Sequence, residues 1–167
     1  MERNGITPKG FDFDNSPFSY QVEKVNGANI CVTTTNGTVA IRKAENAPLL
    51  MVGAFLNISC VVEKLKSWEG NVLVLCAGWK GKPNLEDTLF AGCLIDELNT
   101  LFQVADDAAL MAWQQYNTAS KDLQTAVKNS SHVNRLLKLG IEKDIAFCLE
   151  KDKYHVLPVW SGNCLQL

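Results

Sequence analysis

Short apolar runs alternate with segments of helical periodicity along much of the chain. Three runs, residues 29–35, 48–55 and 71–79, are largely apolar rather than alternating, which is typical of strands buried on both faces. Residues 57–68 and 84–102 instead repeat apolar positions every three or four residues, which predicts helices. Because strands that alternate with helices usually pair in parallel through crossover connections, this pattern predicts a three-layer α/β/α fold with a mostly parallel or mixed sheet.

The second half of the chain is dominated by helical patterns. Residues 106–129 have helical character throughout, and residues 130–140 predict a serine-capped helix that Gly140 stops. Residues 144–160 predict two short strands around a polar turn. We find no internal repeat, low-complexity tract or interdomain linker, so we expect a single domain over residues 1–167.

Composition places the chain among ordinary globular proteins, with 167 residues of which 47% are hydrophobic and 20% are charged. The net charge of -2 and the interleaving of basic with acidic residues argue against a nucleic-acid partner. The longest apolar run, residues 47–56, is too short to span a bilayer. Residues 1–10 are polar where a secretory signal carries an apolar segment. We therefore expect a cytoplasmic protein with no membrane partner.

The six cysteines are scattered singly, mostly inside apolar segments, and no two form a C-x-x-C pair. This spacing favours free thiols in a reducing compartment over a disulfide framework. It also lacks the paired ligands that a structural zinc site needs.

Residues 30–44, ICVTTTNGTVAIRKA, allow two incompatible interpretations. Asn36-Gly37 between two β-prone runs is typical of a hairpin turn, and Val39 and Ile41 alternate as a returning strand would. Alternatively, the polar residues close a strand and open a helix, an arrangement that can hold an anion. The roughly one dozen residues before the next predicted strand are about the minimum for a crossover helix. Periodicity alone leaves both interpretations open.

Three predicted strand ends combine small residues with polar groups, at the edge where open α/β sheets bind ligands. The first is residues 34–38, whose hydroxyl and backbone N–H groups can hold phosphate oxygens, although a simple turn has the same composition. The second joins Gly78 to the Glu86-Asp87 pair, but acids at a helix start also complement the helix dipole. The third is Asn57, for which a helix cap is the simpler role.

Helical geometry distinguishes Asp87 from Asp96 as a candidate metal ligand. At about 3.6 residues per turn the two side chains lie on roughly opposite faces of one helix, so they cannot readily join one metal site. Asp87 is at the strand-to-helix end, beside the candidate site, and is the better candidate. Ala91 and Gly92, one turn further on, would let another backbone or a ligand come close.

The N-terminal residues 10–18 form a polar loop for which two roles are open. Asn15 and Ser16 most simply form an Asx or Ser turn, although a rigid polar loop over a strand end can also bind an anion. Arg3 and Arg42 are the natural candidates for bidentate phosphate or sulfonate contacts, whereas an average arginine is only a surface charge.

The two histidines give no sign of covalent catalysis. His132 falls near a predicted helix start, and His155 lies in a strand-like run. No strained nucleophile elbow accompanies either of them, so we give little weight to a catalytic Ser or Cys.

Taken together, these segments resemble the 2-phosphosulfolactate phosphatase family, the magnesium-dependent enzymes of coenzyme M biosynthesis. The matching pieces occur in the family's order and cover nearly the whole chain. They are ERNG, GFDFDNSP, TTTNGTVAIRKA, GAFLN, LCAGWKGKPNLEDTLFAGCLIDEL and SSHVNRLLKLGIEKDIAFCLEKDKYHVLPV. Each piece alone is a weak signal, but the series is specific.

The resemblance implies the α/β/α fold and favours strand–turn–helix over the hairpin for residues 34–44. It also implies Mg²⁺-dependent removal of phosphate from 2-phospho-3-sulfolactate. On this basis we expect Asp87 and Glu2 to hold Mg²⁺, and Arg3 and Asn36 to make the catalytic contacts to the phosphoryl group. The residues expected to bind the rest of this small anionic substrate are Asn15, Ser16, Thr35, Gly37, Thr38, Arg42, Asn57 and Gly78.

Family members carry a further N-terminal segment, an apolar strand ending in a D-V-x-R-A-T-T motif, ahead of the position of Glu2. We therefore expect this chain to be shortened relative to the family, as a fragment or as a shorter homologue. A second function is then possible, a non-catalytic homologue that binds an anionic metabolite or forms a homo-oligomer, because a lost strand exposes a sheet edge. A third is a phosphatase for another small phosphoester.

Overall fold

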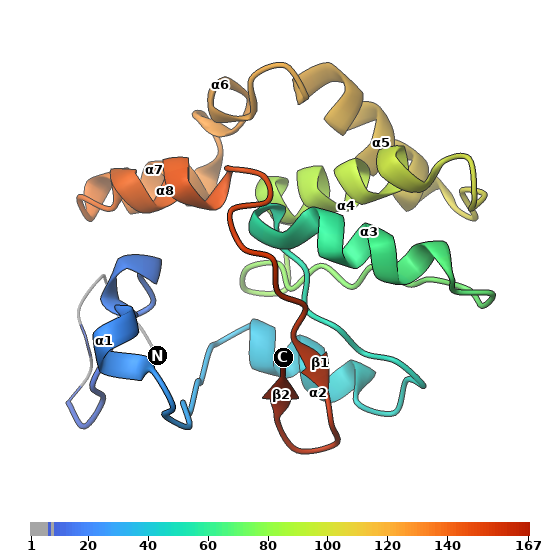
Figure 1. Ribbon diagram of the computed structural model, residues 1–167. Helices are drawn as coiled ribbons and strands as arrows, with labels where there is room; N and C mark the ends of the chain where they lie inside the picture. The colour runs from blue at the N-terminus through green and yellow to red at the C-terminus, as the bar shows by residue number, and fades with distance from the viewer. Residues whose placement is uncertain (1–6, 8) are drawn as a thin grey trace.

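The computed structural model describes residue 7 and residues 9–167, so Glu2 and Arg3 lie outside the described residues. In the described part the chain is built mainly from helices (Figure 1). The longer helices are α2 (Gly37–Ala44), α3 (Ile58–Lys66), α4 (Leu85–Leu98), α5 (Asp107–Ala119), α7 (Ser131–Lys138) and α8 (Glu142–Cys148). The shorter elements are η1 (Pro17–Ser19), α1 (Val22–Val25), η2 (Phe55–Asn57), α6 (Leu123–Val127), β1 (Val159–Trp160) and β2 (Leu165–Gln166).

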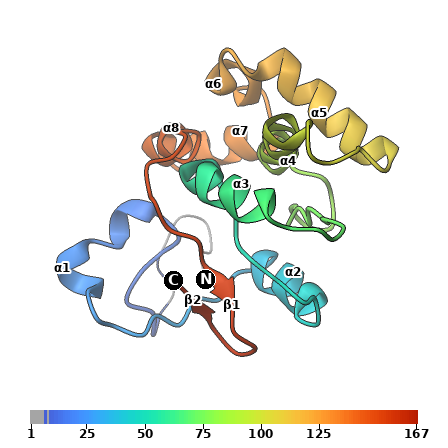
Figure 2. The ribbon, with the colours of Figure 1, turned by 45° about the vertical axis from the view of Figure 1, so that its right-hand side comes forward.

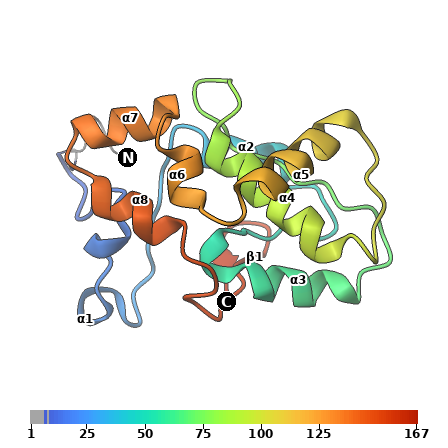
Figure 3. The ribbon, with the colours of Figure 1, turned by 90° about the horizontal axis from the view of Figure 1, so that it is seen from above.

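The hydrophobic core lies among α3, α4 and α5. Figures 1 and 2 show α4 beside α3, with α5 and α2 on opposite sides of this pair. The most deeply buried side chains are Ile58 on α3, Leu89 and Cys93 on α4, and Val127 on α6. Removing such apolar side chains from water stabilises the fold by about 25 cal/mol per Å². Seen from above, α6, α7 and α8 extend beyond α4 toward α1 (Figure 3).

Gly92 allows α4 and α5 to pack in close contact. A Cβ atom at this position would lie 2.1 Å from the Ala112 carbonyl oxygen and 2.6 Å from Cβ of Tyr116. No real Cβ tolerates such distances, so only glycine lets the α5 backbone approach here. The close approach expected at Gly92 is therefore confirmed, and the neighbour is a helix backbone.

Local sequence signals explain several helix boundaries. The side chain of Asp106 caps α5 by accepting from the Ala109 N–H at 2.8 Å. The side chain of Asp122 accepts from the Thr125 N–H at 3.0 Å and so starts a second helix, α6, within residues 106–129. Ser130 caps α7 by accepting from the Val133 N–H at 3.1 Å. Gly140 follows the end of α7 with a φ of +73°. The serine-capped helix stopped by Gly140 is confirmed.

The predicted three-layer α/β/α fold is wrong. The described residues contain one sheet, in which β1 and β2 pair antiparallel with Val159 opposite Gln166 and Trp160 opposite Leu165. Residues 29–34 and 71–78 carry no strand assignment, and the apolar run 48–55 contributes only an isolated bridge, Met51 to Val159. An apolar run becomes a sheet strand only when a neighbouring strand takes its backbone hydrogen bonds. Among the described residues, no strand pairs with residues 29–34 or 71–78.

The structure resolves the two interpretations of residues 30–44. Gly37 begins α2, which continues to Ala44, so the segment is a turn followed by a helix and the hairpin is excluded. Thr34 organises the turn, because its hydroxyl accepts from the Thr38 N–H at 3.0 Å and its carbonyl accepts from the Thr38 hydroxyl at 2.6 Å.

The prediction for the C-terminal segment is only partly right. Residues 142–148 form α8 where a strand was expected, and β1 is the only strand within residues 144–160. Residues 144–148 have little alternation of apolar and polar positions, so the acids at the start of α8 are the better local signal. Among the described helices, none combines the length and the apolar character that a membrane span requires.

Candidate functional site

A hollow of about 860 Å³ lies between α2, α4, α7 and α8. The extended residues 49–55 and 71–77 complete its walls, and the N-terminal loop closes one end. Most of the lining is apolar. The polar groups that line it are Asp14, Asn15, Ser16, Asn71, Glu86, Asp87, His132, Arg135 and Asp144.

Four of the predicted site residues line this hollow. They are Asn15, Ser16, Gly37 and Asp87. They come from three separate parts of the chain: the N-terminal loop, the start of α2 and the first turn of α4. The fold therefore brings together groups that are far apart in sequence, as a shared site requires.

Asp87 is held in place by a glycine turn. Its Oδ2 atom accepts a hydrogen bond from the Gly78 N–H at 2.7 Å. Gly78 has a φ of +66°, and a Cβ there would lie 2.6 Å from the Lys82 carbonyl oxygen. Trp79 and Lys82 close the same turn with two backbone hydrogen bonds of 2.9 and 3.0 Å. Glycine is thus required at position 78 for a turn that orients the Asp87 carboxylate.

Glu86 connects α4 to α7. Its Oε1 atom accepts from Asn84 Nδ2 at 2.6 Å and lies 3.3 Å from Nε2 of His132. Glu86 Oε2 and His132 Nδ1 are buried and have no hydrogen-bond partner within the described residues. Burying such polar atoms unpaired costs free energy, so both atoms are suited to a ligand that enters the hollow.

The N-terminal loop is ordered by Asp14. Its Oδ1 atom accepts from the Ser16 N–H at 2.9 Å and from the Ser19 hydroxyl at 2.6 Å. The Ser16 hydroxyl accepts from the Phe18 N–H at 3.3 Å and so caps η1. These contacts form the turn that the sequence allowed for Asn15 and Ser16, and both residues line the hollow.

The other described candidates do not line the hollow. Thr35, Asn36 and Thr38 belong to the start of α2 beside Gly37, and Gly78 acts through Asp87. Asn57 is 6% exposed and bonds to three backbone groups, those of Ala54, Val52 and Val156, so its amide holds the scaffold together.

Arg42 also lies away from the hollow. Its side chain is 80% exposed and lies 3.8 Å from Glu45. This is the surface charge that the sequence left open as the alternative role for this arginine, and such an exposed ion pair contributes little stability.

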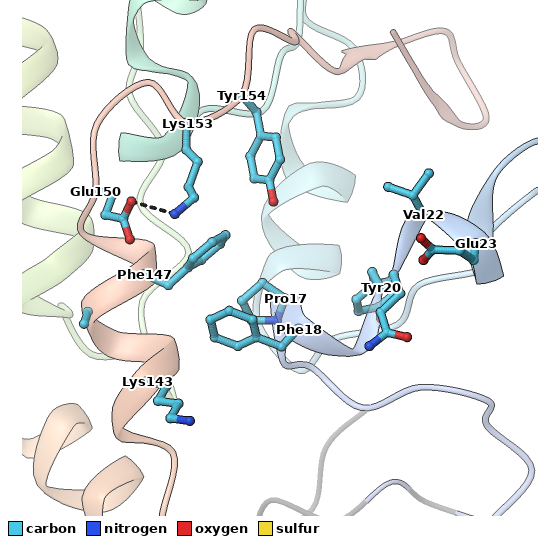
Figure 4. A pocket seen from close by; sticks show the side chains of 12 residues that line it. Pro17, Phe18, Tyr20, Val22, Glu23, Lys143, Phe147, Glu150, Lys153 and Tyr154 are labelled. Atoms are coloured by element: carbon cyan, nitrogen blue, oxygen red, sulfur yellow. Dashed lines mark hydrogen bonds and ion pairs between the residues drawn. The ribbon is translucent and has the colours of Figure 1, made fainter.

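A second hollow lies between residues 17–23, which include η1 and the start of α1, and α8 with the residues that follow it (Figure 4). Its aromatic side chains include Phe18 and Phe147, whose ring centroids lie 4.9 Å apart, and Lys153 lies 4.6 Å from the Phe147 ring. None of the described residues predicted for the site lines it. Its contacts join η1 to α8, and we assign it no chemistry.

Sequence reasoning gave no binding role to several polar residues of the first hollow, among them His132, Arg135 and Asp144. His132 and Arg135 lie three residues apart on α7 and so share a helix face. This spacing was visible in the sequence. What the sequence did not show is that α7 packs with this face toward Asp87.

The charges around the hollow favour a bound cation. The carboxylates of Asp14, Glu86, Asp87 and Asp144 line it, and Arg135 is the only Lys or Arg among the described lining residues. Mg²⁺ is commonly held by one or two carboxylates, with substrate and water oxygens completing its shell. Glu86 Oε2 has no hydrogen-bond partner within the described residues, and Glu86 and Asp87 both line the hollow, so these two carboxylates fit this pattern. Among the described residues, no group of three or more His, Cys, Asp or Glu side chains is placed to hold a metal ion.

Comparison of the sequence with known proteins assigns the chain to a family. The sequence matches the 2-phosphosulpholactate phosphatase family over residues 1–163. The chain belongs to this family. The match includes the N-terminal loop, α2, α4, α7 and α8, which are among the parts that form the hollow.

Relatives from several bacteria support the assignment, and each is described as a probable 2-phosphosulfolactate phosphatase. The Thermotoga petrophila protein is 41% identical over 157 residues, which cover 94% of this chain and 67% of that protein. The Caldanaerobacter subterraneus protein is 37% identical over 158 residues, covering 94% and 66%. The Clostridium acetobutylicum protein is 35% identical over 166 residues, covering 97% and 69%. The matches thus span about two thirds of each relative.

Proposed function

We propose that this chain hydrolyses 2-phospho-3-sulfolactate to sulfolactate and phosphate in the hollow around Asp87, with Mg²⁺ as cofactor. The observation that carries the proposal is that Asp87, Gly37 and the loop of Asn15 line one hollow in a member of this family. On the basis of the family resemblance, we propose that the reaction belongs to coenzyme M biosynthesis. The cytoplasmic location stays a prediction.

The carboxylates of Asp87 and Glu86, with the predicted ligand Glu2, would hold the cation. A bound Mg²⁺ supplies positive charge that stabilises the phosphoryl oxygens as the ester bond breaks. This role is consistent with the lining, because a substrate with several negative charges is repelled by the carboxylates unless a divalent cation compensates them.

The protein's own groups position the substrate. Gly37 lines the hollow at the start of α2, so we expect its backbone N–H to face a phosphoryl oxygen. Asn15 and Ser16 lie on the loop that closes the hollow and supply polar contacts for the acid end of the substrate. The apolar remainder of the lining excludes water and strengthens these electrostatic contacts.

The test measures phosphate release from 2-phospho-3-sulfolactate with and without Mg²⁺. We expect Asp87→Asn to lower kcat/KM by roughly 100-fold or more, since even indirect partners of a metal site are typically worth 10–100-fold. Asp96→Asn is the matched control, because Asp96 is on the same helix but accepts from Trp113 Nε1 at 2.9 Å. Full Mg²⁺-dependent turnover by the Asp87 variant would remove this residue from the metal site.

A substrate panel tests the named substrate. 2-Phospholactate lacks the sulfonate but keeps the ester, so we expect slower turnover of this compound at equal concentration. Equal or faster turnover would assign the chain to another phosphoester.

A second candidate function is self-assembly without catalysis. It is favoured by one observation, the exposed apolar side chains on extended residues 28–34 and 71–78. A chain of this kind need not bind Mg²⁺, so metal titration by calorimetry separates the two candidates.

A further inference from the structure

Arg135 on α7 contributes positive charge to the lining of the hollow. It lines the hollow together with four carboxylates and is the only Lys or Arg among the described lining residues. A phosphate monoester carries up to two negative charges at neutral pH, and its oxygens match the planar fork of a guanidinium. The proposed substrate therefore has one described arginine with which it can pair inside the hollow.

The fold ties Arg135 to the end of the hollow where Asp87 lies. Arg135 is on α7, three residues beyond His132, and His132 Nε2 lies 3.3 Å from Glu86 Oε1. Glu86 directly precedes Asp87 in the first turn of α4. The contact between His132 and Glu86 thus fixes the face of α7 that carries Arg135 against the start of α4.

Trp79 provides a second, independent link. The Arg135 guanidinium lies 5.5 Å from the centre of the Trp79 ring, a cation–π distance. Trp79 follows Gly78, whose N–H donates to Asp87 Oδ2 at 2.7 Å. The same turn therefore orients both the Asp87 carboxylate and the Arg135 guanidinium.

We propose that Arg135 binds the phosphoryl oxygens of the substrate, beside the carboxylate of Asp87. This inference rests on the proposed function, and it assigns the phosphoryl contact to a residue that sequence reasoning did not consider. The phosphoryl group then lies at the Asp87 end of the hollow. The acid end of the substrate points toward the loop of Asn15 and Ser16.

The experiment uses inorganic phosphate, which carries the phosphoryl oxygens without the rest of the substrate. Its affinity is measured with the full chain in the presence of Mg²⁺, both as competitive inhibition of phosphate release and directly by calorimetry. We expect Arg135→Ala to weaken phosphate binding by at least about tenfold, because bonds to charged partners are the strong ones. Arg135→Lys should restore part of this loss, since it keeps the charge but not the fork.

Lys80→Ala is the matched control. Lys80 lies 4.7 Å from the centre of the same Trp79 ring, but it is exposed and does not line the hollow. We expect this variant to bind phosphate as the unmodified chain does. The charge lost is the same in both variants, so a general effect of net charge on anion binding would appear equally in both.

The possible results separate the two proposals. If the unmodified chain releases no phosphate from its substrate, the proposed function fails, while calorimetry with inorganic phosphate still decides the role of Arg135. Equal phosphate affinity in the Arg135→Ala variant and the unmodified chain overturns the inference, as does absence of phosphate binding by the unmodified chain. Should Arg135→Ala fail to fold, the Arg135→Lys variant decides: unchanged phosphate affinity counts against the inference.

Discussion

At the scale of single residues, the two aspartates of α4 show how neighbouring contacts decide a role. Asp87 accepts from a backbone N–H and lines the hollow, whereas Asp96 accepts from the Trp113 indole and serves packing between α4 and α5. Both are carboxylates on one helix. Only Asp87 lies at the helix start, where the turn of Gly78 reaches it.

Replacing Gly78 tests how strongly the site depends on that turn. Gly78→Ala meets two penalties, a left-handed backbone worth roughly 1–2 kcal/mol and a clash with the Lys82 carbonyl worth roughly 1–3 kcal/mol more. We expect a lower free energy of unfolding and reduced phosphate release, measured by chemical denaturation and the activity assay.

Gly81→Ala is the control for this experiment. Gly81 has a φ of +72°, but a Cβ there would meet nothing within 4 Å. This variant should carry the backbone penalty without the clash and keep the Asp87 contact. Equal losses in the two variants would show that the close approach at Gly78 is unimportant.

At the scale of elements, α4, α5 and the segment after α8 are joined by a polar cluster, in which Cys93 and Tyr116 are buried and Lys151 and Glu97 reach the surface. Lys151 Nζ donates to Tyr116 Oη at 2.9 Å and lies 3.6 Å from Glu97. Burial raises the pKa of the Cys93 thiol. The pKa of the Tyr116 phenol is raised mainly by burial and, to a smaller extent, by its hydrogen bond with Cys93. Burial by itself lowers the pKa of Lys151, but its hydrogen bonds to Tyr116 and Cys93 outweigh this effect and raise it.

This cluster predicts a loss of stability at alkaline pH. Each of the three groups has a higher pKa in the folded chain than its ordinary value, so the folded state binds these protons more tightly than the unfolded state does. The stabilisation is fully present at neutral pH and is lost as the pH rises above about 9, the ordinary pKa of a thiol. We expect Tm to fall over this range.

A pair of tyrosine variants locates the effect. Tyr116→Phe should lower Tm at neutral pH and flatten its decline above pH 9. Tyr154→Phe removes the hydroxyl of a tyrosine that is 50% exposed and lies near Lys151 in sequence, and it serves as the control. An alkaline decline that is as steep in Tyr116→Phe as in the unmodified chain would contradict the assignment.

At the scale of the whole molecule, large apolar side chains remain exposed on the extended segments. Leu73 is 86% exposed and Val32 is 55% exposed. The apolar residues of 29–34 and 71–78 predict buried strands, yet among the described residues no strand pairs with them. Extended, apolar and unpaired backbone is prone to pair with another chain.

Self-association can be tested at residues 28–34, which do not line the hollow. Ile30 and Val32 point the same way on an extended chain and are both exposed. We expect the double variant Ile30→Glu, Val32→Glu to shift the chain toward monomer in analytical ultracentrifugation, because like charges oppose edge pairing. Leu167→Glu, at an 89% exposed C-terminal position, should leave the distribution unchanged. A chain that is monomeric at every concentration would exclude self-assembly.

The helical segments that contain α3, α4, α5 and α7 could be predicted from sequence because their signals are local, whereas α8 was predicted as a strand. The apolar spacing in α3 and α4 and the caps Asp106 and Ser130 act within a few residues, so they operate whatever the rest of the chain does. The family motifs likewise predicted site residues at Asp87, Gly37 and the loop of Asn15, and all three line the hollow.

Only the tertiary structure decided which segments meet. Pairing of apolar runs into a sheet depends on hydrogen bonds between residues distant in sequence, and that prediction was wrong for residues 29–35 and 71–79. The two arginines differ for the same reason. Arg42, in the last turn of α2, is exposed to solvent. Arg135 lines the hollow, because α7 packs against the start of α4 through the contact between His132 and Glu86. Residue type and spacing set what each side chain can do, and packing between distant elements sets what it can reach.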